Sequence, residues 1–381
     1  MHILYVLRHD PWGVGGGCSA CRGYLEALGA VFAGSEMDVC ICEEYVAGRN
    51  MGDFPFATFV PVKPRSLVDK LLTPVTRIMH RHQSTVKRLL SERKYAYCIF
   101  DDNCIAGSLV DLCIRNDVRT IVINHNCECE YYRDNTSGAR RRMLLPVVRH
   151  NEDTSYRRCD VNIFLTDEDM ATFKRLYGDS LTRQIVGGCF VHKGTEAAPV
   201  SPEPLNGDTP TVVISGTIGN IQNIDGINYF LESLYKHLPT GSRVVIAGKN
   251  APANLASRLS SYGNITLIDS PKNILEIVSR GDIFLCPTRL GGGMKLRVMD
   301  GLRCGLPVIA HEVSARGYSE FVRHGYLKAF SSAETFAPVL ADTLAAIHQG
   351  TLRRSDIATA AQRSFGFDSA VNRLRDCLLP Q

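Results

Sequence analysis

Short apolar, β-branched runs alternate with helical stretches along the whole chain, and this alternation limits the fold more than any other feature of the sequence. The expected strands lie at residues 2–7, 38–41, 97–100, 120–123, 161–165, 184–186, 211–215, 243–247, 265–268, 283–286 and 307–309. Runs such as TVVIS and DIFLC are almost wholly apolar, as in parallel strands that helices cover on both faces. The sequence therefore predicts an α/β fold of doubly wound, Rossmann-like sheets, with ligands beyond the carboxyl ends of the strands.

The length of 381 residues corresponds to two domains at roughly 100–200 residues each. Residues 192–210 are rich in Pro and Gly and lack apolar periodicity, which indicates a linker in this stretch. We predict a first domain over residues 1–195, a linker over 196–209, a second domain over 210–362, and a C-terminal helix over 363–381 that packs back toward the first domain.

Composition excludes several classes of protein. With 45% hydrophobic and 22% charged residues, the chain is neither disordered nor fibrous. A net charge of +4 is too small for the whole surface to bind nucleic acid. Fourteen cysteines are too sparse for a disulfide scaffold, so we expect reduced thiols. The start of the chain lacks signal-peptide features, and no apolar run approaches the roughly 20 residues of a membrane span. We expect a cytoplasmic protein.

The most informative segment is PTRLGGGMKLRVMDGLRCGLPVIA, residues 287–310, which follows an expected strand. Three consecutive glycines let the backbone approach a ligand, and a helix expected over residues 294–303 turns its amino end toward them. Free N–H groups and the helix dipole favour a diphosphate at such a loop. A glycine triplet alone fits an ordinary turn equally well. Nearby charge would come from Lys295, Arg297 and Arg289.

This segment resembles the donor loop of the retaining family-four glycosyltransferases, which have the GT-B fold, in the subgroup with an Arg-x-Gly-Gly-Gly loop. Residues 214–234 are similar to the Gly-rich turn and helix that open the family's donor domain. SRVVIAGKN and NILEIVSRGDIFLCP also match the family's next blocks. The resemblance implies two Rossmann-like domains that face a cleft, and a nucleotide-sugar donor. The implied donor-binding residues are Gly216, Thr217, Asn220, Gly248, Arg289, Gly291, Gly292, Gly293 and Met294.

The first half resembles the family's acceptor domain. LRHDPWGVGGGCSACRGYLEAL is similar to the glycine loop after the first strand, which implies an acceptor or phosphate loop at Gly15, Gly16 and Gly17. VINHNCECEYYR is similar to the family's His-Asn element, so His125 matches the active-site histidine near the donor sugar. A histidine that only satisfies a core hydrogen bond is the alternative. The resemblance implies these catalytic residues: His125, Lys295, Arg297 and Asp300.

The sequence departs from the family at two places. Many members carry two glutamates eight residues apart in the donor loop, and the matching positions here are Gly292 and Asp300. Only the second acid is kept, and we expect it to bind the ribose hydroxyls. The Arg and Lys that many members place after the first donor-domain strand are absent from GTIGNIQN. The departing diphosphate would then be neutralised by Lys295, Arg297 or Arg289.

We expect no metal and no cofactor. No Asp-x-Asp dyad follows a strand, and the adjacent Asp101 and Asp102 fit a solvated turn better than a site. The Cys18–Cys21 pair lacks a second pair at zinc spacing, so packing is its expected role. If the segment after His125 is extended, Glu128 and Glu130 share one face. We expect Glu130 to face water and leave Glu128 open.

Residues 63–94 combine nine cations and two acids with interleaved apolar residues. Such a basic amphipathic stretch fits an anionic membrane surface, as in related enzymes that use lipid-linked acceptors, or a solvated helix face. The sequence does not separate the two. Peripheral attachment to the inner face of a membrane is therefore one expectation for this chain.

The combined reading is a metal-independent, retaining glycosyltransferase that moves a sugar from a nucleotide diphosphate sugar to a saccharide or lipid-linked saccharide, in polysaccharide biosynthesis. A nucleotide-sugar epimerase of the same fold is one alternative. A catalytically silent nucleotide-binding partner of another transferase is a second, because the first glutamate is missing. A nucleic-acid acceptor is a minor alternative, since binding along the phosphate backbone of a nucleic acid needs a broader basic surface. The fold alone does not separate them.

Overall fold

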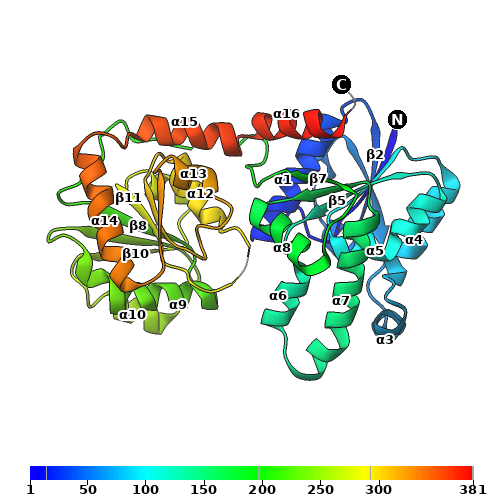
Figure 1. The fold of residues 1–381 in the computed structure, drawn as a ribbon, viewed down its shortest axis with the longest axis horizontal. Coiled ribbons are helices and arrows are strands. Elements are labelled where there is room, and N and C mark those ends of the chain that lie inside the picture. The colour runs from blue at the N-terminus through cyan, green and yellow to red at the C-terminus, as the bar shows by residue number, and fades with distance from the viewer. Residues whose placement is uncertain (14, 196–197, 292, 380–381) are drawn as a thin grey trace. The chain divides into compact units, whose positions relative to one another are not determined.

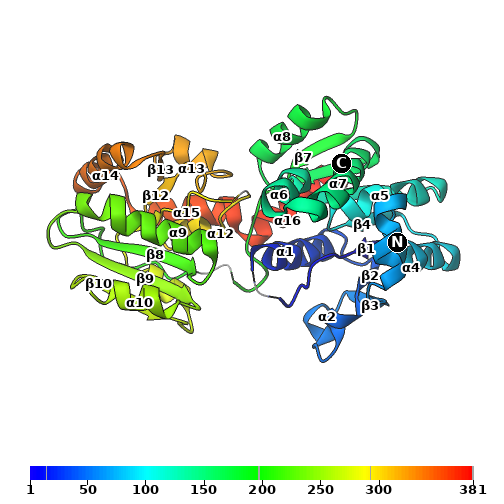
Figure 2. The same cartoon turned by 90° about the horizontal axis from the view of Figure 1, so that it is seen from below.

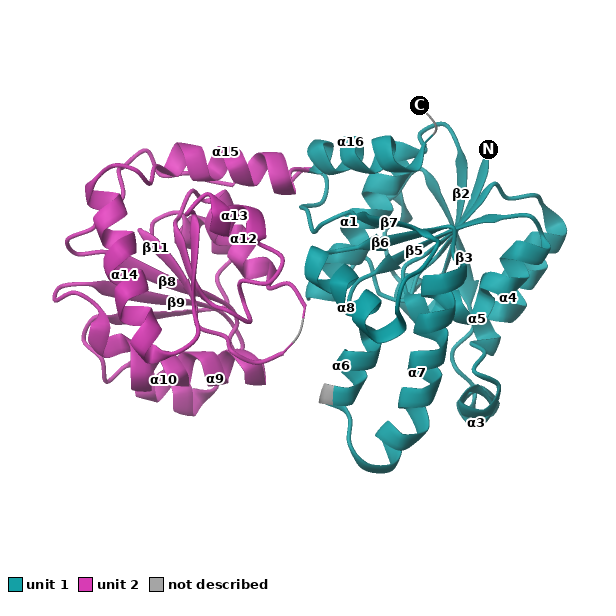
Figure 3. Ribbon diagram, in the orientation of Figure 1, with its two compact units in different colours: residues 1–193, 367–381 teal, residues 194–366 magenta. Residues whose placement is uncertain are grey.

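The computed structural model describes residues 1–13, 15–195, 198–291 and 293–379, without the side chain of residue 134. It divides into two compact units, coloured separately in Figure 3. Unit 1 comprises Met1–Lys193 with Phe367–Gln381, and unit 2 comprises Gly194–Gly366. Within the described ranges, no helix has the length and apolar character needed to cross a membrane.

Unit 1 is built on a seven-stranded parallel sheet in the order β3-β2-β1-β4-β5-β6-β7. Its strands are β1 (His2–Val6), β2 (Glu36–Cys42), β3 (Ala57–Val62), β4 (Tyr97–Phe100), β5 (Arg119–Asn124), β6 (Val161–Phe164) and β7 (Arg183–Val186). The order reverses between β1 and β4, which is the switch point where doubly wound sheets bind ligands. Val6 of β1 aligns with Phe100 of β4, and Phe100 aligns with Val122 of β5, so the loops after these strands emerge at one edge.

Helices cover both faces of this sheet (Figures 1 and 2). They are α1 (Gly16–Val31), α2 (Glu43–Val46), α3 (Leu67–Thr76), α4 (His80–Glu92), α5 (Asn103–Arg115), α6 (Glu128–Asn135), α7 (Gly138–Arg158), α8 (Asp167–Tyr177) and α16 (Phe367–Leu378). A short 3-10 turn lies at Met51–Asp53. The last helix, α16, begins at Phe367 rather than at residue 363, packs on α1 and buries an apolar side that includes Phe367, Val371 and Leu374.

Unit 2 has a six-stranded parallel sheet in the order β10-β9-β8-β11-β12-β13. Its strands are β8 (Thr211–Thr217), β9 (Arg243–Lys249), β10 (Ile265–Asp269), β11 (Ile283–Cys286), β12 (Val308–His311) and β13 (Leu327–Phe330). Its helices are α9 (Ile221–Tyr229), α10 (Ala253–Leu259), α11 (Ile274–Val278), α12 (Leu296–Arg303), α13 (Ser319–Arg323), α14 (Ala333–His348) and α15 (Arg354–Phe365). α9 continues as helical turns to His237. Apolar strand residues such as Ile214, Ile246 and Leu285 form the core.

The predicted fold class is confirmed. Every strand expected from the sequence is present, with ends that differ by one or two residues. Two strands were not predicted, β3 and β13, and both lie at a sheet edge. β3 contains Pro61, which cannot donate a hydrogen bond to a neighbouring strand, and β13 contains Lys328, a charged residue that is common in edge strands.

Candidate functional site

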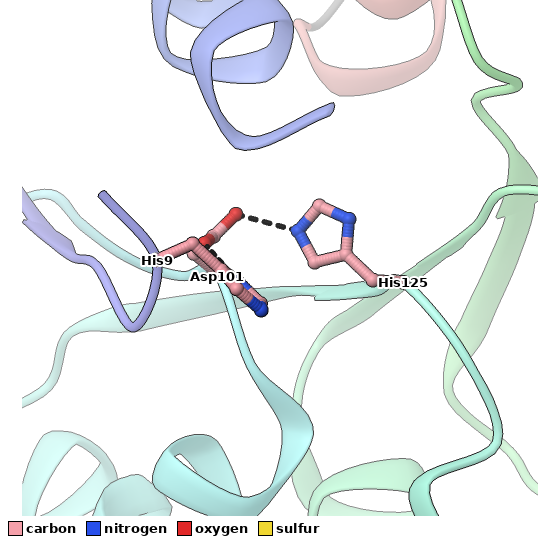
Figure 4. Close-up of side chains that lie close together, drawn as sticks. All are labelled: His9, Asp101 and His125. Atoms are coloured by element: carbon pink, nitrogen blue, oxygen red, sulfur yellow. Dashed lines mark hydrogen bonds and ion pairs between the residues drawn. The ribbon is translucent and has the colours of Figure 1, made fainter. Parts of the chain in front are cut away.

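A buried carboxylate lies between two imidazoles at the carboxyl edge of the first sheet (Figure 4). His9, Asp101 and His125 follow β1, β4 and β5, which are neighbours in the sheet. Nε2 of His125 lies 2.6 Å from Oδ1 of Asp101, and Nδ1 of His9 lies 3.2 Å from Oδ2. The two rings meet edge to face, 5.4 Å between centroids. Asp101 therefore holds one imidazole on each oxygen.

The charges of this cluster are coupled through Asp101. Burial alone would raise the pKa of Asp101, but His125 and His9 hold it well below its ordinary value. For His9, burial favours the neutral ring, and the hydrogen bond and charge of Asp101 outweigh it, so the pKa is raised. Nδ1 of His125 is buried and has no hydrogen-bond partner among the described residues. Since Asp101 occupies Nε2, Nδ1 is the ring nitrogen of His125 that is left without a partner among the described residues.

The glycine loop predicted at residues 15–17 lies against this cluster. Gly15 precedes α1 with a φ of 124°, a value that L side chains rarely adopt, and Gly16 begins the helix. A Cβ at Gly17 would lie 3.3 Å from the His9 ring, closer than side chains normally pack. Tyr24 of α1 meets the His125 ring edge-on, 6.1 Å between centroids. α1 thus contacts both histidines: its amino end packs on His9, and Tyr24, farther along the helix, packs on His125.

The interpretation of Asp101 and Asp102 as a solvated turn is wrong. Both carboxylates are buried, because β4 is a central strand whose end is covered by the segments that follow its neighbours. Oδ1 of Asp102 accepts a hydrogen bond from the Ile105 backbone N–H at 2.8 Å and so caps α5. Its other oxygen pairs with Arg8. The two aspartates therefore serve different partners.

The acidic pair after His125 is helical, so the extended geometry considered from the sequence does not occur. Glu128 begins α6, is buried, and lies 3.2 Å from Nη1 of Arg8. Burial raises the pKa of Glu128 against the opposing charge of Arg8. Glu130, expected to face water, is partly buried and accepts a hydrogen bond from Arg175 at 2.9 Å.

The histidine cluster also consists of residue types that bind metal ions. Among the described residues, the group of His9, Asp101 and His125 is the one cluster whose ligand atoms lie within 4.8 Å of one another. In this cluster the imidazole nitrogens contact Asp101 directly, at hydrogen-bond distances. Cys18 and Cys21 belong to no such cluster in the described part of the chain, and Cys21 is buried.

In unit 2, the predicted donor loop follows β11 and leads into α12, which begins at Leu296 rather than at residue 294. Gly291 and Gly293 have φ angles of 83° and 71°. Gly292, predicted to contact the donor, lies outside the described residues. Four residues predicted to bind the donor belong to the described part of this loop: Arg289, Gly291, Gly293 and Met294.

The basic side chains of this loop differ in their surroundings. Lys295 is buried, with Nζ 3.4 Å from Oε1 of Gln222. Burial, together with the charge of Arg297, lowers the pKa of Lys295 to about 8. Arg289 instead forms a two-pronged ion pair with Asp225 on α9, at 2.9 and 3.0 Å, and lies over the Tyr229 ring. Arg289 is therefore already occupied by α9.

Arg297 belongs to a network that joins the two glycine-containing loops of unit 2. It donates to Oδ1 of Asn223 and, at 3.3 Å, to Oγ1 of Thr288. Asn223 in turn donates to the Thr217 carbonyl at 2.7 Å. A Cβ at Gly216, which has a φ of 143°, would lie 3.1 Å from Nη1 of Arg297. The guanidinium is thus held at the carboxyl ends of β8 and β11.

The remaining predicted donor residues lie at the same edge. Asn220 caps α9 by accepting from the Gln222 backbone N–H at 2.9 Å. Gly248 aligns with Gly216, and a Cβ there would lie 1.6 Å from the Gly216 carbonyl oxygen. Asp300 on α12 lies 3.6 Å from Nη1 of Arg303. Burial raises the pKa of Asp300 to about 6, and the charges of Arg303 and Arg297 act in the opposite direction.

Unit 2 contains a segment that matches a known protein family. Residues 209–348 match the family described as Glycosyl transferases group 1. The match lies wholly within unit 2 and covers less than half of the chain. A search of curated protein sequences finds no match to the chain.

The fold of the whole chain is shared with solved glycosyltransferase structures. Sucrose-phosphate synthase from Thermosynechococcus elongatus superposes with a TM-score of 0.72 at 14% identity, over 99% of this chain and 98% of that one. HepE from Anabaena, in complex with UDP, gives 0.68 at 12% identity, over 99% of both chains. WaaG, a glycosyltransferase involved in lipopolysaccharide biosynthesis, gives 0.63 at 15% identity over 100% of both chains. At these identities the likeness shows the two-sheet GT-B fold.

Sequence reasoning missed four residues that organise these sites. His9 and Asp101 complete the cluster around His125, and Asn223 with Thr288 holds Arg297. The positions of His9 and Asp101 directly after two expected strands were a usable signal, because the ends of neighbouring parallel strands meet at one edge. Asn223 and Thr288 are uncharged residues in a helix and a loop, and nothing in the sequence distinguishes them.

Proposed function

We propose that this chain transfers a sugar from a nucleoside diphosphate sugar to a saccharide or lipid-linked saccharide, with retention of configuration and without a metal ion. The match of residues 209–348 to the group 1 glycosyl transferases carries the proposal, because these residues include the loop with Lys295 and Arg297. HepE, which shares the fold, is known in complexes with UDP and UDP-glucose, and this supports a nucleotide-sugar donor here. The donor would bind at the carboxyl ends of β8 and β11.

The chemistry needs stabilisation of the leaving group. Cleavage of the bond between sugar and diphosphate develops negative charge on the phosphate, which preplaced cations and N–H donors stabilise. Arg297 is held in place by Asn223 and Thr288, so little reorganisation is needed when charge develops. Lys295, with a pKa lowered to about 8, gains a full charge on contact with a diphosphate. Asp300 is proposed to accept hydrogen bonds from the ribose hydroxyls.

In unit 1 we propose His125 as the residue that contacts the donor sugar, through its Nδ1 edge. Asp101 acts as a positioning residue, because it fixes the ring through Nε2 and touches no proposed substrate atom. The glycine loop at residues 15–17, packed on His9, is the proposed acceptor or phosphate loop. The proposal of retention rests on the resemblance to the family. The cations are proposed to stabilise the negative charge that a metal ion stabilises in metal-dependent enzymes.

We also propose that α3 attaches the chain to an anionic membrane surface. Leu67, Leu71 and Val75 recur at a spacing of four residues, and their side chains are 77%, 75% and 80% exposed. This spacing places them on one side of the helix. Exposed cations precede the helix, lie within it and follow it, at Lys63, Arg65, Lys70 and Arg77. An exposed apolar stripe within a basic stretch is typical of helices that lie in the membrane interface.

Product analysis tests the proposal most completely. The full chain is incubated with UDP-, GDP-, ADP- and dTDP-sugars and with saccharide or lipid-linked acceptors, and the products are identified by mass spectrometry. We expect a glycosylated acceptor together with free nucleoside diphosphate. Removal of one preorganised donor typically lowers kcat by about 100-fold, so Arg297→Ala should do so, while Lys272→Ala, an exposed lysine in the same unit, should not. A changed sugar still attached to its nucleotide would instead identify an epimerase.

A further inference from the structure

We propose that a cavity beside α3 binds the phosphate or diphosphate group of an acceptor that carries an apolar chain. The cavity, here called the α3 pocket, has a volume of about 160 Å³ and lies wholly within unit 1. Its lining includes the side chains of Arg8, Arg65, Asp69, Arg81, His82 and Asp102. The assignment rests on the proposed function, because it names the class of acceptor that the transferase would use.

The charge of the α3 pocket favours an anion. Its two carboxylates are already engaged: Asp69 accepts from the backbone N–H and the hydroxyl of Ser66, at 2.9 and 2.8 Å, and Asp102 pairs with Arg8 and caps α5. Of the three guanidinium groups, those of Arg65 and Arg81 form no ion pair within the described part of the chain. The lining carries three guanidiniums and two carboxylates, a formal charge of +1, which suits phosphate.

A buried histidine points to a specific ligand rather than to a general attraction for anions. His82 is 2% exposed, lines the pocket, and neither ring nitrogen has a hydrogen-bond partner among the described residues. Burial, with the charge of Arg81, lowers its pKa to about 3, so the ring is neutral and carries one N–H donor. A buried polar group without a partner is costly, and a phosphate oxygen would satisfy this donor.

The apolar part of the ligand is assigned from α3 itself. Asp69 and Thr73, which line the pocket, are one helical turn apart on the inner side of α3. Leu67, Leu71 and Val75 lie on the outward side, and Arg65 stands exposed just before the helix begins. A membrane that covers the outward side would place lipid phosphates at the rim of the pocket, near Arg65. An amphiphile with an anionic head and an apolar chain fits both sides of the helix.

The pocket also lies next to the proposed catalytic cluster. Arg8 and His9 are consecutive at the end of β1, and Asp101 and Asp102 are consecutive at the end of β4. One residue of each pair faces the pocket, and the other belongs to the histidine cluster. A phosphate in the α3 pocket would therefore hold the saccharide attached to it near His125.

The test compares two probes by isothermal titration calorimetry: inorganic pyrophosphate and geranyl diphosphate, a water-soluble amphiphile. Measurements use full-length protein with Arg297→Ala, so that diphosphate binding at the donor loop does not obscure the result. We expect both probes to bind and the geranyl chain to increase affinity. Arg81→Ala should lower the affinity for both probes about tenfold or more, because it removes a charge-assisted contact. Lys87→Ala removes an exposed charge from the same helix, outside the pocket, and should change affinity less than twofold.

His82 provides a second variant that does not depend on charge. His82→Leu replaces a polar ring with no partner by an apolar side chain, so a purely structural histidine predicts equal or higher thermal stability and no change in binding. The proposal predicts the same stability with weaker binding of both probes.

The inference is overturned if neither probe binds, or if Arg81→Ala and Lys87→Ala have equal effects. Equal affinity for pyrophosphate and geranyl diphosphate would overturn the apolar-chain part and leave a pocket for free phosphate. If the protein transfers sugar but the pocket variants bind the probes as well as their control does, the pocket is refuted and the proposed function stands. Pocket binding in a protein that binds no nucleotide would refute the proposed function alone.

Discussion

At the scale of single residues, Asp101 is the group on which the electrostatics of the first unit depend. It is fully buried, yet it stays ionised because two imidazoles contact its two oxygens. Its folded pKa lies below the unfolded value, so its contribution to stability is present above about pH 4 and lost as pH falls. The pKa of His9 is raised, so its contribution is present below about pH 6.5 and lost as pH rises. Together they favour the folded state most between these limits.

We predict that Asp101→Asn lowers the pKa of His9, because the charge that raises it is gone. The difference in unfolding free energy between the native protein and this variant should be largest between about pH 4 and 6.5 and should shrink above that range. Histidine titration by NMR and urea unfolding at several pH values measure both effects. Asp53→Asn, an exposed carboxylate that accepts from the Trp12 indole, is the control. A stability difference that does not vary with pH would contradict this account of the cluster.

Lys295 gives a prediction about ligand affinity. Its pKa of about 8 means that the charged form is lost between pH 7 and 9, and a diphosphate binds the charged form better. The affinity for a nucleoside diphosphate sugar should therefore fall about tenfold over this range, as measured by calorimetry. Lys295→Arg, which keeps its charge, should remove most of the dependence. If this variant shows the same decline with pH as the native protein, Lys295 is not the titrating group.

At the scale of elements, α3 is distinguished by the side chains that it leaves uncovered. Flotation with anionic liposomes at low salt tests its proposed role. Leu71→Glu and Val75→Glu should abolish flotation, because they place charge on the apolar side. Leu181→Glu is a matched control, since Leu181 is a fully exposed leucine of the same unit away from α3. Equal flotation of all three variants would show that α3 does not carry the attachment.

The sequence predicts most elements of this fold because central parallel strands are apolar on both faces and stand out from their surroundings. Edge strands are less distinct, which is why β3 with Pro61 and β13 with Lys328 were missed. The donor loop could be located because its glycines and cations are consecutive. The cluster around His125 was missed, because its members are separated by 92 and 24 positions and come together only if the order of the strands in the sheet is known. Glu128 begins a helix, since Glu152 of α7 accepts from two N–H groups at its start.

At the scale of the whole molecule, the chain consists of two units that each bury their own core. Nucleotide is proposed to bind unit 2, and the acceptor is proposed to bind unit 1. A ligand stabilises the folded state that binds it, by about 2.7 kcal/mol at 100 times its Kd. In calorimetric unfolding, nucleotide should therefore raise the temperature at which unit 2 unfolds. An equal shift for both units would indicate that they unfold together.

The central claim is that the loop between β11 and α12 binds a nucleoside diphosphate. The most direct test is a thermal-shift panel with UDP, GDP, ADP, dTDP and CMP on the native protein, Arg297→Ala and Lys272→Ala. The account predicts that one diphosphate raises the unfolding temperature of the native protein and of Lys272→Ala, and has little effect on Arg297→Ala. No shift with any of these nucleotides at millimolar concentration, or an equal shift in all three proteins, would contradict it.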